Sequence, residues 1–142
     1  MAEKSVKFAL TGITTDQFAT ISEPEGGEFG LNMSVAIKSD YNNRGIGLNL
    51  SFKFEENEVV FMLIETTTHF VIDESYWNEA SGGGLTKVVL PKDFVQHLVT
   101  LAIGTTRGVL HSKTENTSFN RFVIPLINVT ELGGEDAIIE KE

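Results

Sequence analysis

The chain has 142 residues, a formal net charge of −9 and no cysteine. This length suits a single domain with a core of its own, and the lack of cysteine excludes disulfides, thiolate metal sites and cysteine nucleophiles. The negative charge disfavours nucleic acid as a partner. No apolar run is long enough for a membrane span or a secretory signal, so a cytoplasmic protein without membrane insertion is expected.

The first half of the chain predicts β-strands. Residues 6–13 alternate well enough for a first strand, and residues 14–28 have the composition of a polar loop. Residues 31–38 and 46–54 alternate apolar and polar side chains with a period of two, which is typical of half-buried strands. Short turns on either side of residues 46–54 predict an antiparallel meander that includes residues 59–72.

The strand predicted over residues 59–72 has apolar side chains on both faces of its first half. Strict alternation assigns Met62 and Ile64 to the core and puts Phe61 and Leu63 on the opposite face. One face of an antiparallel sheet usually meets water. Phe61 and Leu63 are therefore candidate contacts for a bound apolar chain.

Tyr76 and Trp77 precede three consecutive glycines, Gly82 to Gly84, which predict a mobile connection. Two interpretations remain open for the aromatic pair. The rings either cap the edge of the core or form a contact point on a flexible lid.

A long helix is predicted from Pro91 to about Ser112, because proline is favoured in the first helical position. Its apolar arc is wider than one sheet covers. Val99, Ile103 and Leu110 lie at the far end of that arc. Either the N-terminal loop or the final strand covers them, or a second subunit does, and self-association is the preferred interpretation.

Gly104 and Gly108 lie at the edge of the polar side of this helix. Each glycine costs about 1 kcal/mol relative to alanine in a helix interior. Glycine allows another backbone to approach closely, which fits a subunit interface, although a tolerated surface glycine would give the same pattern.

The end of the chain predicts an extended segment and then a tail. Residues 121–129 are apolar on both faces, and Pro125 argues for a sheet edge or a peripheral addition. Residues 133–142 read as a flexible acidic tail. The expected fold is α+β, with a four-stranded antiparallel sheet packed by one long helix and followed by the proline-containing segment, in a single domain over residues 1–132.

No sequence pattern makes a positive case for an enzyme, a metal site or a cofactor. Glu65, Thr67 and His69 share one strand face and form either a polar cluster in a groove or a solvated strand end. Acidic residues gather at several places, including Glu55, Glu56 and Glu58. They serve either solubility or docking of a basic partner.

Four features of the second half occur in a suggestive order: Pro91 opening the helix, Arg107 with Gly108 near its end, Pro125 in the extended segment, and Asn128 after it. In this order they resemble the SecB-like family of protein-export chaperones. The resemblance covers residues 6–132 in architecture and residues 91–128 in motif. It implies a homotetramer, built as a dimer of dimers, that holds unfolded chains in long apolar grooves without a cofactor.

The resemblance also implies delivery of clients to the SecA motor through an acidic sheet surface. The export chaperones continue into a second helix and a basic tail, whereas Leu132 is followed here by acidic residues, so docking on that motor is in doubt. Three functions remain: an oligomeric holdase for unfolded polypeptides, an oligomeric module with one dedicated protein partner, or a small-molecule binder using Glu65 and His69.

Each function comes with candidate residues. The candidates for client binding are Phe61, Leu63, Tyr76 and Trp77. The candidates for the oligomer interface are Val99, Ile103, Gly104, Gly108 and Leu110, and those for partner docking are Glu55, Glu56 and Glu58.

Overall fold

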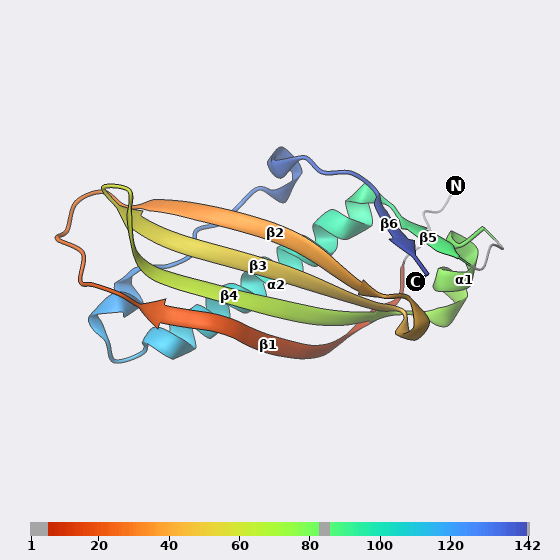
Figure 1. Cartoon of the computed structure of the whole chain (residues 1–142), viewed down its shortest axis with the longest axis horizontal. Coiled ribbons are helices and arrows are strands. Elements are labelled where there is room, and N and C mark those ends of the chain that lie inside the picture. Colours follow the sequence, from red (N-terminus) through yellow and green to blue (C-terminus); the bar gives the residue numbers. More distant parts are fainter. Residues whose placement is uncertain (1–5, 83–85, 142) are drawn as a thin grey trace.

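The computed structural model describes residues 6–82 and 86–141 (Figure 1). One sheet contains β1 (Phe8–Thr20), β2 (Gly30–Asp40), β3 (Gly45–Glu56) and β4 (Val59–Ile72). The helices are α1 (Glu74–Ala80) and α2 (Lys92–Thr114), and a second small sheet pairs β5 (Lys87–Leu90) with β6 (Ala137–Glu140). Short 3-10 turns are η1 (Tyr41–Asn43), η2 (Ser118–Arg121) and η3 (Val129–Leu132). The predicted fold class, a four-stranded antiparallel sheet packed by one long helix, is confirmed.

The main sheet has the strand order β1-β4-β3-β2, so β1 and β2 are its two edges. The predicted meander from β2 through β3 to β4 is confirmed. The loop predicted over residues 14–28 is wrong for its first half, because β1 continues to Thr20. Register shifts after Leu10 and after Thr15 interrupt the alternation of β1, which hid this strand from a period-two pattern.

The core lies between the sheet and α2, which crosses one face of the sheet obliquely (Figure 1). All inward residues of β3 from Ile46 to Phe54 are buried. Thr106 of α2 hydrogen-bonds to Thr66 of β4 across this layer, with 2.7 Å between their hydroxyl oxygens. The two buried hydroxyls thus satisfy each other between helix and sheet.

After α2 the chain returns along the helix toward its start, where β6 pairs with β5 (Figure 1). We call residues 128–141 the strap. The predicted flexible tail is wrong for residues 137–140, because Ile139 is buried where it pairs with Val88. This pairing joins residues that are about fifty positions apart in the chain, so no local pattern reveals it.

Candidate functional site: an apolar groove beside an open sheet edge

Phe61 is not on the outer face of the sheet. Phe54 pairs with Met62 while Glu55 pairs with Val60, so Phe61 is the extra residue of a β-bulge. The bulge turns its ring inward, against Phe54 and Phe122, and only 2% of the side chain is exposed. Phe61 therefore belongs to the core, and its assignment as a client contact is wrong for this fold.

Leu63 lies on the outer face, opposite Ala19 and Lys53, and is half-buried there. A single half-buried leucine between these neighbours does not make an apolar surface. Val59, at the start of β4, is exposed, but with Phe61 buried and Leu63 half-buried the continuous apolar face predicted for β4 is not formed.

Tyr76 and Trp77 lie in α1, which begins after Asp73 caps it by accepting the backbone N–H of Tyr76. Trp77 is only 4% exposed and packs against the ring of Tyr41. The ring of Tyr76 faces Phe94, and burial raises the pKa of its hydroxyl. The pair closes one end of the core, which agrees with the interpretation that the two rings cap the core edge. Gly83 and Gly84 of the predicted lid lie outside the described residues.

The predicted helix interface is partly covered by the chain itself. Val99, Ile103 and Leu110 are all buried, so these three are not free for a second subunit. Arg107 fastens the covering segment, because its Nε donates to the carbonyl of Ile124 and its Nη2 donates to that of Pro125, each at 2.8 Å. The segment after α2 therefore covers the far end of the helix's apolar arc, which was the alternative to coverage by a second subunit.

Gly104 and Gly108 remain exposed on α2. A Cβ atom added at Gly104 would come no closer than 4.0 Å to Arg107, and one added at Gly108 would meet nothing within 4 Å. Together with Val123 they line a hollow of about 380 Å³. The backbone of α2 is thus accessible from outside the chain at these two positions.

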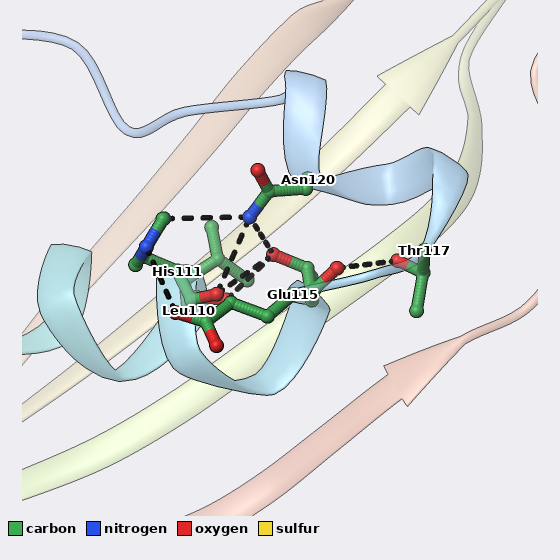
Figure 2. Close-up of polar contacts among 6 residues, drawn as sticks. Leu110, His111, Glu115, Thr117 and Asn120 are labelled. Atoms are coloured by element: carbon green, nitrogen blue, oxygen red, sulfur yellow. Dashed lines mark hydrogen bonds and ion pairs between the residues drawn. The ribbon is translucent and has the colours of Figure 1, made fainter.

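The turn that redirects the chain at the end of α2 is held by side chains (Figure 2). Asn120 Nδ2 donates to the carbonyl of His111 at 3.3 Å and to Thr114 Oγ1 at 3.1 Å. Thr114 Oγ1 donates to the carbonyl of Leu110 at 2.8 Å, and Thr117 Oγ1 donates to that of Thr114 at 2.7 Å. These bonds satisfy the last helix carbonyls and direct the C-terminal segment back along α2.

The predicted acidic docking residues have different environments. Glu55 accepts a hydrogen bond from Asn32, and Glu58 is exposed at the turn between β3 and β4. Glu56 accepts the backbone N–H groups of residues 25, 26 and 27 at 2.8 to 3.1 Å. The N–H of Glu25 above all, helped by those of Gly27 and Gly26 against the opposing effect of desolvation, holds the pKa of Glu56 below its ordinary value. Glu56 thus anchors the β1–β2 loop.

The outer face of the sheet carries a polar cluster. Asn49 Nδ2 donates to Glu65 Oε2 at 2.9 Å and to Thr67 Oγ1 at 3.2 Å, while Thr67 Oγ1 donates to Asp16 Oδ2 at 2.6 Å. His69 contacts Thr14. These groups satisfy one another, which gives no specific support to a small-molecule site. Within residues 6–82 and 86–141, no set of three or more histidine, aspartate and glutamate side chains is placed to hold a metal ion.

The two sheet edges differ in a way the sequence did not reveal. β1 is interrupted by two register shifts, a feature that protects an edge from further pairing. β2 pairs with β3 without a break from Gly30 to Asp40, and among the described residues it has no partner on its other side. It contains no proline, so its outer edge is an open template for another extended chain.

An apolar groove lies beside this open edge. Val35 and Ile37 pair with buried Leu50 and Leu48, so they point to the core side, yet they are 41% and 42% exposed. They border a groove of about 220 Å³ with a wall from α2 and a wall from the strap. Its other residues are Lys92, Val95, Gln96, Val99, Val129, Leu132, Gly133, Gly134 and Glu135.

The alternation over residues 31–38 puts Val35 and Ile37 on the apolar face of a half-buried strand, but nothing in that pattern marks them as candidate site residues. Alternation gives the face of a strand, whereas the position of that strand in the sheet decides whether the face is covered. Among the described residues, no helix is long and apolar enough to cross a bilayer. No protein-family model, no curated protein and no solved structure matches this chain.

Proposed function

We propose that the protein is an oligomeric holdase that binds unfolded or nascent polypeptides without ATP, in the manner of the SecB-like chaperones that its motif resembles. The observation that carries this proposal is the uninterrupted open edge of β2 next to exposed Val35 and Ile37. The proposed activity is binding alone, with no catalysed reaction and no cofactor.

Two interactions would hold the client. An extended chain added to β2 forms backbone hydrogen bonds that do not depend on its sequence. Alternate side chains of that chain then point toward Val35, Ile37 and the groove, where burial contributes about 25 cal/mol per Å² of apolar surface. This combination selects extended apolar segments, which folded proteins keep inside.

The test is suppression of the aggregation of a chemically unfolded model enzyme by the purified protein, followed by light scattering. Ile37→Glu puts a charge at the groove and should abolish suppression. Ile13→Glu is the matched control, because Ile13 is 48% exposed on the inner face of the opposite edge strand. Equal suppression by both variants, or none by the parent protein at excess, would rule the proposal out.

Self-association is part of the same proposal. The hollow beside Gly104 and Gly108 leaves helix backbone open to a second copy. Leu126, 93% exposed on the neighbouring segment, supplies an apolar side chain for that contact. The tetramer implied by the resemblance remains a prediction, and light scattering of the parent protein measures it.

A second candidate is a docking module with one dedicated basic partner. Ile21, Phe29 and Val59 are exposed at the end of the sheet where the β1–β2 loop lies over β3, and Glu58 is exposed there as well. The sequence over residues 21–30 and 55–59 contains six glutamates and no lysine or arginine. A single species in a pull-down, lost with Val59→Lys, together with failed aggregation suppression, would favour this module over the holdase.

A further inference from the structure

We infer that the strap is a displaceable gate over the β2 groove, which must swing away before a polypeptide can occupy the full length of the edge. This inference rests on the proposed function, because it concerns the control of the same groove. It assigns a role to residues 128–141, which the proposed binding mode uses only as one wall of the groove.

With the strap in place, the groove is too small for an extended polypeptide that follows the full length of β2. Its volume is about 220 Å³, whereas sites for drug-sized ligands occupy roughly 300 to 1,000 Å³. Val129 and Leu132 of the strap line it from one side, opposite Val35 and Ile37. These strap side chains stand where the apolar side chains of a bound chain would enter, so strap and client compete for one space.

The strap is held by few contacts. Val129 and Ile139 are its buried side chains, while residues 130–136 are all exposed. Four residue pairs join β6 to β5, the N–H of Lys141 donates to the carbonyl of Thr86 at 2.7 Å beyond them, and this small sheet is separate from the main one. The inner side of this sheet, with Val88, Leu90 and Ile139, packs into the core, and Ile139 is the one buried side chain that β6 contributes to it. Segments with so little burial open locally far more often than the core does.

Polar contacts from the strap to α2 are also reversible. Asp136 Oδ1 accepts the backbone N–H of Lys92 at 2.8 Å, at the first turn of the helix. Gln96 Nε2 donates to the carbonyl of Gly133 at 3.0 Å. Both helix groups lie on the exposed side of the groove, where water replaces the strap as a partner without leaving a buried group unpaired.

The strap has a built-in hinge. Gly133 has a φ of 75° and Gly134 a φ of 120°, in a region of backbone conformations that other residues rarely adopt. The pair lies between η3, which borders the groove, and β6, which holds the end of the strap. Rotation at these two glycines lets β6 leave β5 first and η3 leave the groove second, so that displacement of the whole strap begins with the release of β6.

A reversible disulfide tests the gate. Val89 and Ile138 pair across β5 and β6 on their less buried side. Directly paired antiparallel residues have Cα atoms about 4.5 to 5.5 Å apart, within the range a disulfide spans. Since the chain has no cysteine, Val89→Cys with Ile138→Cys gives one thiol pair that locks the strap when oxidised. The reduced form of the same protein is the matched control.

Binding is measured by the fluorescence anisotropy of a labelled synthetic peptide in which valine alternates with threonine between terminal lysines. The reduced variant should bind like the parent protein, and oxidation should weaken binding more than about tenfold, because the open state is no longer populated. Ile139→Ala, which loosens the strap, should bind more tightly than the parent. Equal affinity of oxidised, reduced and Ile139→Ala proteins would overturn the gate.

Hydrogen exchange of the amides of residues 137–140 in the free protein separates this inference from the proposed function. Exchange faster than in β3 of the same molecule, slowed by the disulfide, is expected of a gate even if no peptide binds. Absence of peptide binding by the parent protein would remove the holdase proposal alone. Protection of these amides equal to that of β3 would remove the gate alone.

Discussion

Replacing both Gly104 and Gly108 with alanine should stabilise the folded chain and weaken the proposed self-association. Both glycines lie inside α2, where alanine is favoured over glycine by about 0.8 to 1 kcal/mol each. The new methyl groups meet no atom closer than 4.0 Å in the protomer. The two gains therefore add to about 2 kcal/mol, which is a rise in Tm of about 4 to 8 °C for a chain of 142 residues.

The assay combines thermal unfolding by circular dichroism at low protein concentration with multi-angle light scattering at high concentration. Two methyl groups push a neighbouring backbone away, so the double variant should have a smaller mass than the parent protein while its protomer melts at a higher temperature. Gly133→Ala is the matched control. The same substitution at φ 75° and ψ −144° should destabilise the protein, because alanine does not adopt that conformation without strain.

Two results would refute this reasoning in different places. A protomer destabilised by the double substitution would mean that the outer side of α2 is not open at these positions. A stabilised protein that keeps the parental mass would show that the glycines are merely tolerated, and the proposed contact between copies would have to lie elsewhere.

Three further predictions concern single interactions. Arg107→Ala should lower the free energy of unfolding in urea by about 2 to 3 kcal/mol, because two carbonyls of the C-terminal segment lose a charged donor. Full stability of Arg107→Lys would contradict the need for one guanidinium to donate to both carbonyls. The pKa of Glu56 is lowered on folding, so its contribution to stability is present above the unfolded value of about 4.3 and is lost as the pH falls through the folded value. The Tm of Glu56→Gln should accordingly fall less on acidification than that of the parent protein. If the Tm of both proteins falls equally with pH, ionised Glu56 does not stabilise the fold. Thr106→Val should lower the free energy of unfolding by about 1 to 3 kcal/mol, because it leaves the Thr66 hydroxyl buried and unpaired. Adding Thr66→Val to the same chain should restore part of this loss. If the effects of the two substitutions in urea denaturation simply add, the two hydroxyls are not coupled.

The sequence by itself determined the elements whose signal is local. Alternation in residues 46–54 and 59–72 predicted β3 and β4, because the side-chain period of a strand is written in consecutive residues. Pro91 placed the start of the long helix, and its apolar arc was wider than one sheet covers, although self-association was the preferred interpretation of that width. These features need no knowledge of what lies across the sheet.

The tertiary structure alone decided what covers each apolar surface and which edge stays open. Phe61 turned inward because the pairing of β3 with β4 contains a bulge, and a register shift depends on two strands together. Val99 and Ile103 are buried within the chain itself, and Arg107 holds the segment that returns along α2 through the carbonyl of Ile124, seventeen residues away. Val35 and Ile37 became groove residues because β2 is an edge strand. Coverage depends on contacts between distant parts of the chain, and a periodic pattern carries no information about them.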